Sequence, residues 1–203
     1  MSSALPGRST SWGQALPVKL VDWWQGLELA KFYMPPGWDR GYTSALIGTY
    51  ITAAPFDLQR GGTISGLLLE LVTAGSAGSL TRMGIWADNG TGYYPGALLV
   101  DGGEVDSSVT GYADLVATIS LAVTPQKLWI GAHTKDVTTE PTFRRVSYDD
   151  KTLGVTGMTD GGMSLVYATL TYGAFATTAN PFPAGAGQSN APWRVGIRFS
   201  ALS

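Results

Sequence analysis

The sequence contains no cysteine and only one histidine. Without cysteine, disulfide frameworks and zinc sites built on thiolates are both excluded. Nucleophilic catalysis needs a base beside a hydroxyl, and the one histidine, His133, accompanies no G-x-S-x-G elbow. We therefore expect a non-enzymatic protein that is made in a reducing cytoplasm, is stabilised by packing, and holds no metal or cofactor.

Charged side chains are scarce as well, at 14% of the chain, against about 25% in typical globular domains. The net charge of −2 gives no basic footprint for nucleic acid. No run approaches the roughly 18 apolar residues of a membrane span, and the N-terminus lacks the basic and apolar regions of a secretory signal. A surface so poor in charge favours coverage by partner proteins, and a glycine- and threonine-rich monomer is the alternative.

Glycine and proline are plentiful, with 27 and 11 copies among 203 residues. Such a composition suits short strands joined by turns rather than helices. The pattern predicts an all-β protein, an antiparallel β-sandwich or jelly roll of about eight or nine strands, with an extended N-terminal arm. We expect the arm at residues 1–40 and the sandwich at residues 41–203. Residues 165–176 are predicted as a strand or hairpin arm near the end of the sandwich.

Residues 81–106 have the clearest pattern in the chain and predict a β-hairpin. Met83 and Ile85 alternate with Arg82 and Trp86, which is the period-2 pattern of a half-buried strand. Asp88-Asn89-Gly90 then predicts a turn, because Asn and Gly accept a positive φ. In the second arm, Asp101-Gly102-Gly103 interrupts the apolar run and predicts a bulge or kink.

The same hairpin resembles a β-sandwich domain of the minor tail proteins and fibres of phages of Gram-positive bacteria. The pattern is R-x-G-I-[YW]-x-D-x-G, then Y-P-G-x-L-x-x-D-x-G-x-V-D, then T-G, and Trp86 stands where the family pattern has Tyr. It is carried here by Arg82, Gly84, Ile85, Trp86, Asp88, Gly90, Pro95, Gly96, Leu98, Asp101, Gly103, Val105, Asp106, Thr110 and Gly111. The resemblance extends over roughly half the chain. It implies a virion location, contacts with other virion proteins, and a homo-oligomer for which a trimer is the first expectation.

Alternating apolar residues in the other predicted strands define the expected core. One face of each strand points inward, so the residues that share that face should meet in the middle of the sandwich. The expected core residues are Leu67, Leu69, Leu71, Met83, Ile85, Leu128, Ile130, Val195 and Ile197.

Four acidic residues, Asp88, Asp101, Glu104 and Asp106, form the one dense acidic group. A pair of carboxylates could serve a glycosidase, and several could supply oxygen ligands for Ca²⁺. The full D-x-[DN]-x-[DN]-G calcium loop is absent, however. Asp in a turn-rich hairpin more often bonds its own backbone in an Asx turn, and we favour that interpretation.

The remaining chemistry is a possible glycan-binding surface. Arg82 and Trp86 share the face of one strand that points away from the expected core, and Trp129 and His133 share that of another. Apolar faces of sugars stack on aromatic rings while polar side chains bind their hydroxyls. The alternative, which we favour, is that a neighbouring subunit, a loop or the arm covers these rings.

The predicted arm contains four of the seven tryptophans: Trp12, Trp23, Trp24 and Trp38. Residues 18–32 are the one stretch with helical spacing, although Gly26 weakens it. An arm so rich in Trp, with no core of its own, is expected to anchor the protein on a partner.

These features lead to two main hypotheses, and a small glycan-degrading enzyme is a third. The first is a structural phage virion protein, a minor tail, fibre or head-surface component anchored by its arm. The second is a carbohydrate-binding module that contributes to recognition of glycans on the host surface.

Overall fold

A computed structural model describes residues 29–33, 42–45, 48–58, 60–90, 94–109, 113–135, 138–145, 165–184, 187–189 and 195–203. This part of the chain forms twelve strands and one helix of four residues. The elements are β1 (Phe32–Tyr33), β2 (Tyr42–Ala45), β3 (Tyr50–Leu58), β4 (Gly62–Thr73), β5 (Leu80–Asp88), β6 (Pro95–Asp106), β7 (Ala113–Val123), β8 (Gln126–Thr134), β9 (Thr142–Arg145), β10 (Leu165–Thr169), α1 (Phe175–Thr178), β11 (Gly187–Ser189) and β12 (Val195–Leu202). The strands exceed the expected eight or nine because the edge strands β1, β2 and β11, of two to four residues, are too short to show a period-2 pattern.

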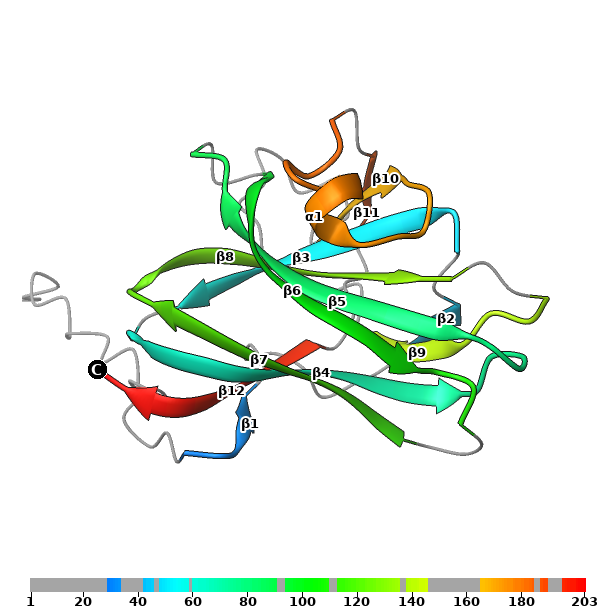
Figure 1. Ribbon diagram of the computed structural model, residues 1–203, viewed down its shortest axis with the longest axis horizontal. Coiled ribbons are helices and arrows are strands. Elements are labelled where there is room, and N and C mark those ends of the chain that lie inside the picture. Colours follow the sequence, from blue (N-terminus) through cyan, green and yellow to red (C-terminus); the bar gives the residue numbers. More distant parts are fainter. Residues whose placement is uncertain are drawn as a thin grey trace, which may run out of the picture.

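The strands form two antiparallel sheets that pack face to face (Figure 1). Sheet I has the order β1-β12-β4-β9-β2, and β7 pairs with the other edge of β4. Sheet II has the order β11-β10-β3-β8-β5-β6. This arrangement confirms the prediction of an all-β sandwich.

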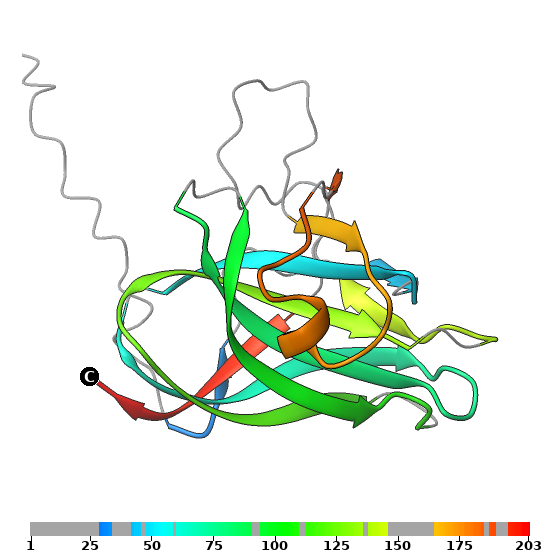
Figure 2. The same cartoon turned by 45° about the horizontal axis from the view of Figure 1, so that its top comes forward.

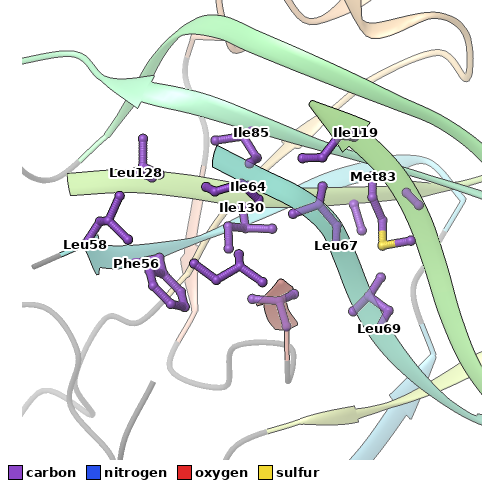
Figure 3. Packing of buried hydrophobic residues seen from close by; sticks show 14 of the residues in the cluster. Phe56, Leu58, Ile64, Leu67, Leu69, Met83, Ile85, Ile119, Leu128 and Ile130 are labelled. Atoms are coloured by element: carbon purple, nitrogen blue, oxygen red, sulfur yellow. The ribbon is translucent and has the colours of Figure 1, made fainter. Parts of the chain in front are cut away.

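One hydrophobic core fills the space between the sheets (Figure 3). It includes all nine residues expected from the sequence, each of them buried. The prediction succeeds because the alternation of side chains along a strand is local, so the pattern identifies the inward face without knowledge of the strand's neighbours. Phe56, Phe143 and Phe199 complete the core from β3, β9 and β12.

The predicted hairpin is the pair β5–β6. Its register shifts between Arg82 and Gly84, where one residue of β5 faces two of β6, and Gly103 there has φ of 76°. The expected bulge is therefore present, and glycine is required at its left-handed residue. Each of three hairpin aspartates accepts a hydrogen bond of 2.8–2.9 Å from the backbone N–H two residues later, which confirms the Asx-turn interpretation: Asp88 from Gly90, Asp101 from Gly103, and Asp106 from Ser108.

Two predictions near the ends of the chain need correction. The predicted helix at residues 18–32 does not reach Phe32, because Phe32–Tyr33 is strand β1, paired with Arg198 and Ile197 of β12. Part of the predicted arm is thus an edge of sheet I. The anchoring residues Trp12, Trp23, Trp24 and Trp38 lie outside the described residues.

The second correction concerns residues 165–176. A strand occupies only Leu165–Thr169, and Phe175 begins the helix α1. Within the described residues, no helix has the length and apolar character to cross a membrane.

Candidate functional site

The four residues predicted as a glycan-binding surface lie together on the face of sheet II that points away from the main core. β5 and β8 are hydrogen-bonded neighbours, and their register places Arg82 opposite His133 and Trp86 opposite Trp129. Side chains directly opposite each other in an antiparallel pair are about 5 Å apart at Cβ. The sequence predicted which face each residue occupies, and the pairing of β5 with β8 merges two separate predictions into one patch.

This face is covered by residues 170–184, a segment that we call the strap. Figures 1 and 2 show the strap, which includes α1, in orange on the side of sheet II opposite to β4, β7 and β12. Its ends are fastened by backbone hydrogen bonds of 3.0 Å from Leu170 N–H to the Thr49 carbonyl and from Phe182 N–H to the Gly96 carbonyl. The strap and sheet II together form a second hydrophobic core of Ile51, Ala53, Trp86, Trp129, Val166, Ala168, Phe175, Ala179 and Phe182.

Both tryptophans of the patch are fully buried, with exposed fractions of 0%. The Trp86 Nε1–H donates to the Ala179 carbonyl of the strap at 2.8 Å, and the Trp129 Nε1–H donates to Asp88 Oδ1 at 2.9 Å. Phe175 and Phe182 contact the Trp86 ring, with centroid distances of 5.1 and 5.5 Å. The rings therefore offer no exposed surface on which a sugar could stack, which agrees with the favoured interpretation that another part of the protein covers them and not with the sugar platform.

Two glycines make room for the Trp86 ring. Gly84 and Gly131 are cross-strand partners next to it on the same face. A Cβ at Gly131 would lie 2.6 Å from Trp86 Cζ3 and 2.8 Å from the Thr52 carbonyl oxygen. One at Gly84 would lie 2.9 Å from the Phe175 ring. The indole thus lies over backbone that carries no side chain, and this lets the strap approach the sheet closely.

Arg82 links β5 to β6 and, through Asp101, to the strap. Its Nη1 donates to both carboxylate oxygens of Asp101, at 2.9 and 2.8 Å, and its Nη2 lies 3.3 Å from Glu104 Oε1. Asp101 also accepts a hydrogen bond of 3.0 Å from the backbone N–H of Phe175, the first residue of α1. The carboxylate therefore holds the arginine and the start of the helix at once.

His133 is fully buried beside this ion pair. Its Nε2 lies 2.8 Å from the Gly48 carbonyl oxygen, so Nε2 carries the proton in the neutral ring. Burial lowers the pKa of His133, and the hydrogen bond to Gly48 opposes that shift in part. Tyr172 of the strap packs on the imidazole with a centroid distance of 5.2 Å. A histidine enclosed in this way is structural, because no substrate could reach it.

The sequence did not identify Tyr172 or the strap as parts of this site. Phe175 and Phe182 were the available signal, since two large apolar rings near the end of the sandwich need a surface to bury them. Among the described residues, no group of three or more His, Cys, Asp or Glu side chains is close enough to hold a metal ion.

These observations define a class of protein: a two-sheet antiparallel β-sandwich whose second face is closed by a strap from its own chain. No family model matches the sequence, and no curated protein matches it. A solved structure of the cysteine protease and lectin-like domains of Cwp84, a surface-layer-associated protein of Clostridium difficile, is similar with a TM-score of 0.46 and 13% identity. The match covers 79% of this chain and 36% of that chain, and a likeness of this degree assigns no function.

Proposed function

We propose that this chain is a structural phage virion protein, a minor tail, fibre or head-surface component that displays its sandwich on the particle. The closed face of sheet II is the observation that carries the structural role. The two tryptophans best suited to a sugar are fully buried in a second core. The described part therefore serves better as a rigid scaffold than as an open binding surface.

The resemblance of the β5–β6 hairpin to phage tail domains supports the virion setting. Several residues of that pattern set the shape of the hairpin: Asp88 and Gly90 make one Asx turn, and Asp101 and Gly103 make the bulge. The pattern therefore indicates a structural scaffold and not a ligand-binding site. The low charged fraction of 14% also suits a surface that neighbouring proteins cover.

Immunogold labelling of purified particles from the phage that encodes the chain tests this proposal. Label on intact particles, at a constant position on tail or head, is the expected result. A matched preparation from a phage that lacks the gene is the control. Abundant protein in the lysate with none on the particles would contradict the proposal.

Binding of host-surface glycan is the alternative outcome, and calorimetric titration of the full chain with host wall polysaccharide measures it. We expect at most weak binding, since the two rings are enclosed by the strap. Tight binding that persists after Trp86→Ala and Trp129→Ala would place a sugar site elsewhere and favour a carbohydrate-binding module.

A further inference from the structure

Three buried polar atoms without a hydrogen-bond partner lie together between the strap and sheet II. They are Arg82 Nε, His133 Nδ1 and the Tyr172 hydroxyl, and they are the buried side-chain N and O atoms of the described residues that lack a partner. Arg82 and His133 are cross-strand neighbours, and Tyr172 packs on His133. A buried polar group without a partner is costly, so three in one place need an explanation.

The donors and acceptors at this place identify what would satisfy them. Arg82 Nε–H can only donate, and His133 Nδ1 can only accept because Nε2 carries the proton toward Gly48. The Tyr172 hydroxyl does both. Burial raises the pKa of Tyr172, and of its charged neighbours Glu104 raises that pKa further while Arg82 lowers it. No hydrogen bond of ordinary geometry joins the hydroxyl to either.

The chemistry excludes ions. A cation would face the guanidinium of Arg82, and an anion would have no proton for His133 and would lie beside the carboxylates of Asp101 and Glu104. A neutral molecule with both donors and acceptors meets all three demands, and water is the smallest one. Buried waters typically make about three hydrogen bonds to polar groups of this kind.

We propose that Arg82, His133 and Tyr172 form a binding site for one internal water, which accepts from Arg82 Nε–H, donates to His133 Nδ1 and bonds the Tyr172 hydroxyl. The water joins the strap to β5 and β8 at the end of the patch farthest from the tryptophans. It complements the direct link from Phe175 N–H to Asp101. This site is independent of the proposed virion role.

Tyr172→Phe tests whether the hydroxyl is hydrogen-bonded at this site, because the sign of its effect differs between a satisfied and an unsatisfied hydroxyl, and a crystal structure distinguishes water from a direct bond. If water satisfies the hydroxyl, its removal costs a hydrogen bond and raises the unfolding equilibrium constant roughly two- to tenfold. If the hydroxyl has no partner, its removal relieves a buried unsatisfied group and leaves that constant unchanged or lower. Denaturant titration of the full chain measures the difference, and an unchanged or lower constant would overturn the proposal.

Tyr94→Phe is the matched control. The Tyr94 hydroxyl donates directly to the Pro183 carbonyl of the strap. Its loss therefore calibrates what one satisfied hydrogen bond to the strap contributes. We expect Tyr172→Phe and Tyr94→Phe to lower the free energy of unfolding to a similar degree.

A crystal structure of the unaltered chain at about 1.5 Å or better provides a second readout that does not depend on a variant. Density for a water within 2.6–3.2 Å of all three atoms is the expected result. A well-ordered site in which the three side chains bond one another directly, or in which no density lies between them, would overturn the proposal.

Discussion

Trp86 shows how one side chain shapes the surface around it. Its ring lies over the bare backbone of Gly84 and Gly131, and its N–H bonds the Ala179 carbonyl. Burial of so large a ring favours folding by roughly 1.5–3 kcal/mol. The glycines cost some backbone entropy in a strand, and the close approach of ring, sheet and strap offsets that cost.

We expect Gly131→Ala to lower the free energy of unfolding by about 1–3 kcal/mol, as overpacking in a well-filled core does. The added methyl would meet the Trp86 ring at 2.6 Å and the Thr52 carbonyl oxygen at 2.8 Å, and neither can move freely. Gly66→Ala is the control, since its methyl would meet only the end of the flexible Arg198 side chain, at 3.2 Å. Equal effects of the two variants in denaturant titrations would contradict the close packing of the Trp86 ring on Gly131.

His133 gives the second prediction at this scale. Its pKa is lowered in the folded state from the ordinary 6.5, so the unfolded chain binds more protons as the pH falls below that value. The free energy of unfolding should therefore be constant above about pH 7 and decrease as the pH falls through 6.5 toward the folded pKa. Arg82 is the cross-strand partner of His133, Tyr172 packs on its ring, and the Gly48 carbonyl lies at its Nε2.

Denaturant titrations at several pH values between 5 and 8 measure this dependence. His133 is the only histidine in the chain, so His133→Gln should remove the change between pH 7 and 5.5. A variant that keeps the full pH dependence would assign it to other groups.

At the scale of elements, the strap covers the face of sheet II that points away from the main core. Its helix is too short to be stable alone, and what orders it is the contact of Phe175 and Phe182 with Trp86. Hydrogen bonds at Leu170 and Phe182 fix its ends. The strap should thus open as a unit before the sandwich unfolds.

Phe175→Ala tests that order of events. Loss of a fully buried phenylalanine costs about 3–5 kcal/mol of stability. Here most of that loss should destabilise the strap and not the sheets. We expect faster proteolytic cleavage within residues 170–184 while the sheets stay protected, measured by limited proteolysis and mass spectrometry.

Phe56→Ala is the matched variant in the main core, since Phe56 is also buried there. It should lower the stability of the whole sandwich without selective cleavage of the strap. The same cleavage pattern for both variants would show that strap and sandwich unfold together.

At the scale of the whole molecule, two cores on the two faces of sheet II hold the structure together. The larger lies between the sheets, and Ile85 of β5 is fully buried within it. We expect Ile85→Ala to cost about 2–5 kcal/mol of unfolding free energy in a denaturant titration. A loss below about 0.5 kcal/mol would show that this face of β5 does not form the core.

The anchoring role of the N-terminal residues stays a prediction, and the fold changes how it must be tested. Deletion of residues 2–28 leaves β1 (Phe32–Tyr33) in place beside β12, so the sandwich should fold. We expect the truncated chain to stay free of virions while the full chain joins them, as measured on purified particles. Normal incorporation of the truncated chain would place the virion contact on the sandwich itself.

Much of the fold follows from short-range pattern. The nine expected core residues, the β5–β6 hairpin, its bulge and its Asx turns were all predicted, because side-chain alternation and turn chemistry depend on a few neighbouring residues. β1 could not be predicted in this way. Its two residues become a strand only because they pair with Arg198 and Ile197, far along the chain.

The sequence by itself determined which face of each strand is apolar and that Arg82, Trp86, Trp129 and His133 point away from the main core. Only the tertiary structure decided that these four side chains meet, because the pairing of β5 with β8 joins residues about fifty positions apart. It also decided that the strap, and not solvent or sugar, covers them. The reason is physical: alternation is a local property of a strand, whereas the partner of an apolar face is whichever segment the whole chain folds onto it.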